Sequence, residues 1–500
     1  MNVIDKDAYV ARFPNVFSNR VGKLNNYTLK LFIDKSVRPV AEKHRHIPFH
    51  MRQKVAAEIK NMLDDGIIEH VTGPTDWLMA PVIVPKKNGK VRIVVDARPA
   101  NKAIKRIRNV TPTVEELFNE INGAKWFSKV DLKSGFHQLV LDEDSRYITV
   151  FSTHIGVFRY QRLNMGICCA SEIFQHVMES KVLYGIKGIR VVCDDILFYG
   201  KTKEEHDQIV NQVLSRLNEK GMTVNPDKCE FSKSSVEFYG MVFSADGVQL
   251  TSEKVRALKA AKTPSTPGEV SSLIGLATYC SKFIPNLSSI TDPLRKLTVK
   301  GAEWLWLKKH DIALETLKNT IMTNALAYFD PNWMTEIVVD ASPIGVGAIL
   351  VQRDPSSPET CRVVAYASKA LSPVERRYSH IEKEGYAAVW GCEKFHMYIY
   401  GQSFKLITDN KSLEYIFKNP KTKTPAIIER WCLRLSQYDF TPEHRPGKYN
   451  PADYLSRNPV DPTEYSNIAE EYVNYLIDEN LYRNHYHARK SRKLQMMTIC

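Results

Sequence analysis

Three aspartates lie where an ionised side chain is costly. Asp131 ends an apolar run with the composition of a buried strand, and Asp194 and Asp195 separate the apolar runs 189–193 and 196–199. Buried carboxylates lose solvation, and neighbouring like charges raise one another's pKa. A divalent cation relieves both costs, and Mg²⁺ prefers oxygen ligands. The pattern suits a two-metal phosphoryl-transfer site, but the adjacent pair taken alone is more typical of a solvated hairpin turn.

A second set of acids follows in the C-terminal part. Asp340 and Asp409 each end an apolar strand pattern, and Asp453 follows a loop-to-helix step. Glu384 falls on the apolar face of a helix expected near 375–400, where an unpaired carboxylate is unfavourable. Taken singly, each acid is also typical of a helix cap or a surface ion pair. If two strands and two helices bring all four together, they form a second two-metal site.

The elements that must hold these acids follow from periodicity and turn signals. Helices are predicted at 49–68 and 204–220, and a mostly helical segment at 252–325. An Asn-Gly turn predicts a hairpin of 80–85 with 91–96. Further strands are predicted at 126–131, 136–142, 189–193, 196–199, 236–243, 248–250, 336–341, 346–352, 362–368 and 403–408.

Composition excludes several classes of protein. At roughly 150 residues per domain, 500 residues suggest about three compact units. The 69 basic and 56 acidic side chains give a net charge of +13, which suits a polyanionic partner. We find no apolar run of the ~18 residues that a membrane helix needs, no secretory signal at the start, and no Cys-x-x-Cys pair. A membrane-spanning, zinc-knuckle or disulfide-framework protein is therefore disfavoured.

Three ordered segments resemble motifs of a known family. LMAPVIVPKKNGKVRIVVDARPAN (78–101), KVDLKSGFHQ (129–138) and VVCDDILFY (191–199) look like successive reverse transcriptase motifs of gypsy-type LTR retrotransposon pol polyproteins. The resemblance runs from about residue 12 to about residue 475. It implies a multidomain α+β fold, a right-hand polymerase of fingers, palm and thumb followed by an RNase H-like α/β domain. The expected divisions are fingers and palm at 1–245, a helical thumb or connection at 246–328, an RNase H-like domain at 329–458 and a disordered tail at 459–500.

The resemblance assigns roles around the first acids. Asp131, Asp194 and Asp195 would bind two Mg²⁺ or Mn²⁺ ions in the palm, which the triphosphate of the incoming deoxynucleotide would bridge. Lys87 and Arg92 match the residues that clamp that triphosphate. The alternative for Lys87 is a solvated turn.

Other positions match the polymerase pocket. Phe136 matches the steric gate that excludes a 2′-hydroxyl, with an ordinary core aromatic as the alternative. Phe238, Tyr239 and Gly240 match the primer grip, or are simply part of a buried strand. Lys228 matches a proton donor to the leaving pyrophosphate.

The second set resembles the RNase H domain of the same polyproteins. Asp340, Glu384, Asp409 and Asp453 match its acids in order, and would hold two metal ions that activate water to cut RNA in an RNA–DNA hybrid. His444 matches a mobile residue that aids product release, or is a plain loop histidine. The implied partners are RNA template, DNA primer, hybrid and deoxynucleoside triphosphates, without a membrane. The implied location is intracellular, in cytoplasmic virus-like particles and the nucleus.

Some positions depart from the family pattern. Val192 replaces an aromatic, Cys193 an aliphatic, Asn164 and Met165 precede Gly where the family has Pro-Phe, and Ser171 replaces a Pro. No metal ligand is lost. The expected function is RNA-directed DNA polymerase (nucleotidyltransferase) with RNase H (hydrolase) activity. A decayed nucleic-acid-binding relic and an unrelated Mg²⁺-dependent nuclease are the alternatives. The protease and integrase motifs of a complete polyprotein are not found, so we expect a fragment, a processed form or a truncated copy.

Overall fold

The computed structural model describes residues 6–43, 45–86, 89–107, 114–321, 325–357, 360–419 and 422–446. The predicted sites Lys87 and Asp453 and the predicted tail at 459–500 lie outside these residues. The chain divides into two units, Met1–Tyr239 and Gly240–Cys500. Within the described ranges, no helix combines the length and the apolar character that crossing a membrane requires.

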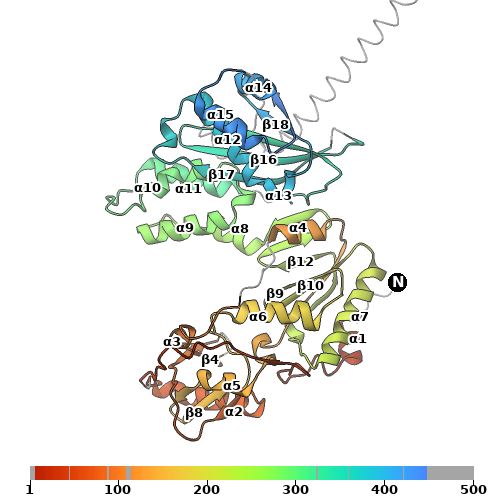
Figure 1. Ribbon diagram of the computed structural model, residues 1–500, viewed down its shortest axis with the longest axis vertical. Helices are drawn as coiled ribbons and strands as arrows, with labels where there is room; N and C mark the ends of the chain where they lie inside the picture. Colours follow the sequence, from red (N-terminus) through yellow and green to blue (C-terminus); the bar gives the residue numbers. More distant parts are fainter. Residues whose placement is uncertain are drawn as a thin grey trace, which may run out of the picture. The chain divides into compact units, whose positions relative to one another are not determined.

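The first unit is built on a four-stranded antiparallel sheet in the order β11-β5-β10-β9. Helix α7 covers it, as Figure 1 shows beside β10. The helix begins at Thr202, whose side chain accepts from the Glu205 N–H, and ends at Gly221 in the left-handed conformation, φ 72°. The strands of the first unit are β1 (Thr28–Leu29), β2 (Ile68–His70), β3 (Pro81–Pro85), β4 (Val91–Val95), β5 (Trp126–Asp131), β6 (Val140–Leu141), β7 (Phe151–Thr153), β8 (Gly156–Tyr160), β9 (Ile189–Val192), β10 (Asp195–Gly200), β11 (Glu230–Lys233) and β12 (Ser235–Phe238). Its helices are α1 (Lys6–Arg12), α2 (Phe49–Asp64), α3 (Arg98–Asn101), α4 (Val114–Ile121), α5 (Glu143–Arg146), α6 (Ala170–Val177) and α7 (Lys203–Lys220).

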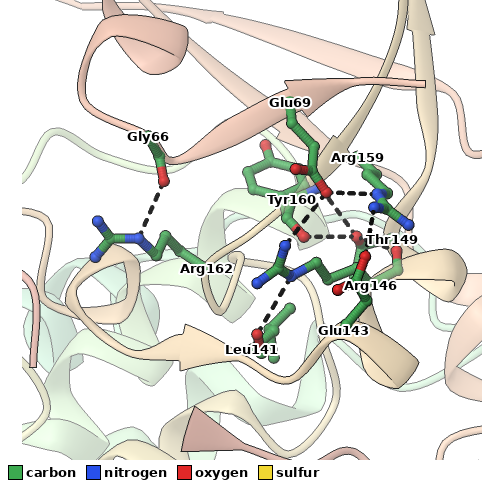
Figure 2. A network of polar contacts seen from close by, with 9 residues as sticks. All are labelled: Gly66, Glu69, Leu141, Glu143, Arg146, Thr149, Arg159, Tyr160 and Arg162. Atoms are coloured by element: carbon green, nitrogen blue, oxygen red, sulfur yellow. Dashed lines mark hydrogen bonds and ion pairs between the residues drawn. The ribbon is translucent and has the colours of Figure 1, made fainter. Parts of the chain in front are cut away.

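An ion network fastens the smaller sheet β2-β8-β7 to helix α5 (Figure 2). The Glu69 carboxylate on β2 accepts from Arg159 Nε on β8 at 2.6 Å and from Arg146 Nη1 on α5 at 3.4 Å. Arg159 also reaches Glu143 on α5 at 3.3 Å. The Thr149 hydroxyl donates to the Arg146 carbonyl and accepts from the Tyr160 N–H. These contacts join segments about 80 residues apart in the sequence into one rigid layer.

Three sequence predictions are wrong in detail. The helix predicted at 49–68 ends at Asp64, and Ile68 begins strand β2. Residues 136–142 do not form one strand, because a 3₁₀ turn occupies Gly135–Gln138 and only Val140–Leu141 form a strand. The buried Gln138 amide donates to the Thr223 carbonyl and accepts from the Thr223 N–H, which stabilises the turn. The strand predicted at 236–243 is interrupted at Tyr239 and Gly240, with φ 51° and 71°. Both φ values are incompatible with a strand.

The second unit contains a mixed five-stranded sheet in the order β17-β16-β15-β18-β19. Strands β15, β16 and β17 are antiparallel neighbours, whereas β18 runs parallel to both β15 and β19. The strands of this unit are β13 (Met241–Ser244), β14 (Gly247–Leu250), β15 (Met334–Ala341), β16 (Gly345–Arg353), β17 (Cys361–Ala370), β18 (Phe404–Thr408) and β19 (Phe440–His444). The four strands predicted from 336 to 408 are confirmed.

Helices surround this sheet. Helix α12 packs on β15 and β16, with Gly391 against the side chains of Val339 and Ala348. Helix α10 contacts β17 and β16, so the helical segment predicted at 252–325 lies in the same unit as the sheet (Figure 1). The division between 328 and 329 stays a prediction. The helices are α8 (Ser252–Lys259), α9 (Pro267–Tyr279), α10 (Leu287–Lys296), α11 (Lys308–Thr320), α12 (His380–Lys394), α13 (His396–Ile399), α14 (Lys411–Lys418) and α15 (Ala426–Leu435).

A buried ion triad stabilises the second unit. Glu336 on β15 is 2% exposed and accepts from Arg353 Nε at 3.1 Å and from Arg445 Nη1 at 3.0 Å.

We expect Glu336→Ala to lower the free energy of unfolding by about 3–5 kcal/mol, since it leaves buried guanidinium groups without their carboxylate. Urea unfolding measures this. Lys418→Ala, which breaks an exposed pair with Glu414 on α14, is the control and should change it by less than about 1 kcal/mol. Equal effects would contradict the buried-charge argument.

Candidate active sites

The antiparallel register of the first sheet brings the first set of acids together. Asp131 on β5 lies directly opposite Asp195 on β10. Strands β9 and β10 form a hairpin in which Val192 pairs with Asp195, so Cys193 and Asp194 form a two-residue turn. Cys193 has φ 53°, a conformation that non-glycine residues rarely adopt and that such turns demand. The turn sets the Asp194 side chain beside the other two carboxylates.

Burial and mutual repulsion govern the charges of this cluster. Burial, followed by the charges of Asp131 and Asp195, raises the pKa of Asp194 to about 6. Burial and the charge of Asp131 also raise the pKa of Asp195. Lys228 Nζ lies 2.9 Å from Asp131 Oδ2 and opposes both shifts. The cluster therefore has an excess of negative charge that one ammonium group does not cancel.

The Asp194 carboxylate fits a metal ligand. Its Oδ1 is buried without a hydrogen-bond partner among the described residues. Gly135 makes room for it, because a Cβ there would lie 2.6 Å from this oxygen. An oxygen-only donor set with an orphaned buried oxygen suits a hard divalent cation. Sequence reasoning missed Gly135, whose only signal is its position four residues after Asp131.

The other predicted polymerase residues have different surroundings. Arg92 on β4 is exposed, and its positive charge is among those that lower the pKa of Asp194. Phe136 is partly buried, with its ring 5.2 Å from that of Phe174. Phe238 is buried and Tyr239 is 53% exposed, whereas Gly240 begins the second unit. These contacts are compatible with both the pocket roles and the plain structural interpretations.

Asn164, which departs from the family pattern, leaves a buried oxygen without a hydrogen-bond partner among the described residues. Asn164 is fully buried, and its Oδ1 has no hydrogen-bond partner within the part of the chain described. Its Nδ2 donates to the Met165 carbonyl at 3.2 Å. The nearby Gly166 has φ 103°, which only glycine adopts easily. The Asn101 side chain fixes this turn by donating to the Gly166 carbonyl at 2.8 Å. A buried polar atom without a partner destabilises the segment by about 1–3 kcal/mol.

The second set of acids comes together at the carboxyl ends of strands β15 and β18 in the second sheet. Parallel β15 and β18 are in register at Val338 and Ile407, so Asp340 and Asp409 are level at the carboxyl ends of adjacent strands. Glu384 on α12 is completely buried, and its Oε1 accepts from the Ala341 N–H at 3.3 Å. Carboxylate oxygens of Asp340, Glu384 and Asp409 all lie within 4.8 Å of one another. Among the described residues, Asp131, Asp194 and Asp195 do not form a group within this distance.

Two imidazoles lie beside the second cluster. His444 Nε2 is 3.1 Å from the Asp409 carbonyl oxygen, which places this predicted residue at the site. His380 Nε2 is 4.0 Å from Glu384 Oε1, and its side chain is largely exposed. Glu382 is not in the cluster, because it caps α12 by accepting from Ser379. The three carboxylates form an all-oxygen donor set that fits Mg²⁺ or Mn²⁺.

Two family models match the chain. Residues 84–243 match "Reverse transcriptase (RNA-dependent DNA polymerase)", and residues 330–438 match "RNase H-like domain found in reverse transcriptase". The first range contains the cluster of Asp131, Asp194 and Asp195. The second contains the cluster of Asp340, Glu384 and Asp409. The two acid sites thus fall in two matched domains.

Curated relatives and solved structures agree with these matches. The chain is 32% identical over 425 residues to the Tf2-3 transposon polyprotein of Schizosaccharomyces pombe, covering 84% of this chain and 31% of that protein. It is 30% identical over 470 residues to the Pol polyprotein of transposon 297 of Drosophila melanogaster, covering 91% and 42%. The chain thus spans less than half the length of these relatives.

Foamy viral protease-reverse transcriptase has the same fold. Its complex with double-stranded DNA matches with a TM-score of 0.75 at 25% identity, covering 87% of this chain and 92% of that chain. Its complex with an RNA/DNA hybrid matches with a TM-score of 0.72 at 24% identity, covering 87% and 59%. The expected multidomain α+β polymerase fold, with an RNase H-like mixed sheet after it, is confirmed. The chain belongs to the reverse transcriptases of LTR retrotransposon Pol polyproteins and carries a reverse transcriptase domain and an RNase H-like domain.

Proposed function

We propose that this chain copies RNA into DNA at the cluster of Asp131, Asp194 and Asp195, and cuts the RNA strand of the hybrid product at the cluster of Asp340, Glu384 and Asp409. The observation that carries the proposal is the convergence of buried and partly buried carboxylates in both matched domains. Such clusters are unfavourable unless a cation joins them.

In the polymerase site, two divalent cations would be held by the three aspartates and would stabilise both oxygens of an in-line displacement at the α-phosphorus. The residues of the chain supply the rest. The exposed Arg92 guanidinium is suited to a phosphate group. The Lys228 ammonium lies against Asp131 and would give a proton to the leaving pyrophosphate. The Phe136 ring, which lies against Phe174, would form the wall beneath the sugar.

In the RNase H-like site, two Mg²⁺ or Mn²⁺ ions would be held by Asp340, Glu384, Asp409 and Asp453, and would activate a water for phosphodiester hydrolysis. The Ala341 N–H fixes the Glu384 carboxylate. His444 contacts the Asp409 backbone, and from there it would aid release of the product.

The proposed partners are an RNA template, a DNA primer, deoxynucleoside triphosphates and the RNA–DNA hybrid. Structural neighbours bound to double-stranded DNA and to an RNA/DNA hybrid support the choice of duplex ligands. The net charge of +13 suits phosphate contacts, so binding should weaken steeply with salt. We place this activity in cytoplasmic virus-like particles and the nucleus, as for a retrotransposon polyprotein.

A second candidate is a folded relic that binds nucleic acid without catalysis. Its support is the buried, unpartnered Oδ1 of Asn164 in a turn where the family has Pro-Phe-Gly. Disorder in that turn would impair the nucleotide pocket without removing a metal ligand. Primer extension and hybrid cleavage by the unmodified chain separate the two candidates.

We expect the two activities to be separable. Asp194→Asn should reduce primer extension on an RNA template about a hundredfold or more while hybrid cleavage continues, because one ligand of one metal cluster is lost. Asp340→Asn should do the reverse. Extension and cleavage are measured on the same preparations with Mg²⁺. Equal loss of both activities in a folded variant would contradict two independent sites, and hybrid binding without either activity in the unmodified chain would favour the relic.

Phe136→Ala should admit ribonucleotides. Removing the ring opens the space that a 2′-hydroxyl would occupy, and relief of a clash worth about 1.4 kcal/mol raises ribonucleotide incorporation about tenfold. The measurement is kcat/KM for each nucleotide type. Phe174→Leu, which changes only the neighbouring ring, is the matched control. Unchanged sugar selectivity would leave Phe136 as a core aromatic.

Asp194 should make stability depend on pH. Its pKa is raised from 3.8 to about 6 in the folded protein, so the neutral form favours folding. This stability is complete below about pH 4 and is lost as pH rises through 6. In EDTA, Asp194→Asn should therefore have a higher Tm than the unmodified chain above pH 6, with the gap closing below pH 4. Mg²⁺ should narrow the gap, since only the intact cluster binds it well. A gap independent of pH would refute the raised pKa.

A further inference from the structure

Helix α10 begins on the sheet face to which the Asp340 side chain points. Asp340 on β15 is directly opposite Gly347 on β16, and Gly347 is directly opposite Ser368 on β17. Directly opposite residues of neighbouring strands point to the same face. The Ser288 N–H at the start of α10 donates to Ser368 Oγ at 3.0 Å. The start of α10 and the Asp340 side chain therefore share one face.

Asp340, Gly347 and Ser368 form a row across three strands, and Asn286 lies over its middle residue, Gly347. A Cβ added at Gly347 would lie 2.4 Å from Asn286 Oδ1, so the Asn286 amide fills the space that the missing side chain leaves. Asn286 is 9% exposed and has φ 48°. Opposite Cβ positions are about 4.5–5.5 Å apart. The amide over Gly347 is thus next to the Asp340 carboxylate.

Several contacts hold this segment in place. Asp292 on α10 is 5% exposed and accepts from Arg376 Nη2 at 2.7 Å, while Lys296 Nζ lies 2.7 Å from its other oxygen. Ser289 Oγ lies 3.3 Å from Ser342 Oγ, two residues after Asp340. These contacts lie on both sides of the row. They restrict the position of Asn286 relative to the acids.

We infer that Asn286 is a positioning residue for Asp340: its amide group donates to the Asp340 carboxylate and directs the oxygens toward Glu384 and Asp409. A segment before the matched RNase H-like range of 330–438 therefore completes the acid site. Metal-ligating carboxylates are commonly oriented by such outer hydrogen bonds, whose loss weakens metal affinity 10–100-fold. The inference rests on the proposed metal-binding function of this site.

The test uses the full chain in an Asp194→Asn/Asp195→Asn background, where Mn²⁺ binding reports the second site. Asn286→Gly removes the amide while tolerating the left-handed φ. We expect at least about tenfold weaker Mn²⁺ binding by calorimetry, and a lower kcat for hybrid cleavage with KM unchanged. Gly275→Ala in α9, where an added Cβ meets no atom within 4 Å, is the matched control and should leave both unchanged.

A double-mutant cycle makes the test specific. Gly347→Ala places a methyl group against the Asn286 amide and should also weaken Mn²⁺ binding. In the Asn286→Gly background the same methyl has room, so the double variant should bind Mn²⁺ no worse than Asn286→Gly alone.

Other outcomes would overturn the inference. Unchanged Mn²⁺ affinity in folded Asn286→Gly, or additive losses in the cycle, would show that Asn286 only fills space. Faster cleavage by Asn286→Gly would show a segment that covers the acids instead of orienting them. If the unmodified second site binds Mn²⁺ through Asp340 but never cleaves hybrid, the proposed function fails while the calorimetric comparison still tests Asn286. Absence of Asp340-dependent Mn²⁺ binding would overturn both.

Discussion

Repulsion between carboxylates gathered at the ends of buried strands is the constraint on which the rest of this structure depends. Folding must remove Asp131, Asp194 and Asp195 from water and hold them together. The raised pKa of Asp194 reflects the free-energy cost of bringing these charges together away from water. The positive charges of Lys228 and Arg92 oppose this rise in pKa. The clustered carboxylates therefore lower the stability of the fold, and under our proposal bound divalent cations offset this cost.

The two sheets meet this constraint in different ways. In the first, antiparallel pairing sets Asp131 opposite Asp195, and the strained turn at Cys193 adds Asp194. In the second, parallel pairing brings Asp340 and Asp409 to the same edge, and α12 adds Glu384. Both use a glycine to give space to a polar group beside an acid. Gly135 admits the Asp194 carboxylate, and Gly347 admits the Asn286 amide beside Asp340.

The positions that depart from the family pattern lie in the segments around these acids, and the acids themselves are unchanged. Asn164 lies buried in the turn before Gly166, with an oxygen that has no partner among the described residues. Whether that turn still shapes a nucleotide pocket decides between an active enzyme and a folded relic. The helical segment also surrounds an acid cluster, because α10 packs on the RNase H-like sheet within one unit. Under our inference, changes in α10 would alter the second acid cluster without replacing an acid.

The acids, their strands and the family were predictable from the sequence, because a carboxylate at the end of an apolar run is a local and costly pattern. Local patterns were less reliable where a distant partner decides the backbone. The residues from 136 to 142 have strand composition, yet hydrogen bonds between Gln138 and Thr223 stabilise a 3₁₀ turn in which Phe136 lies. Asn286, Gly347 and Asp340 carry no shared motif. Only the register of three strands, with a helix start above them, brings them side by side, because cross-strand neighbours are set by tertiary pairing and not by spacing in the sequence.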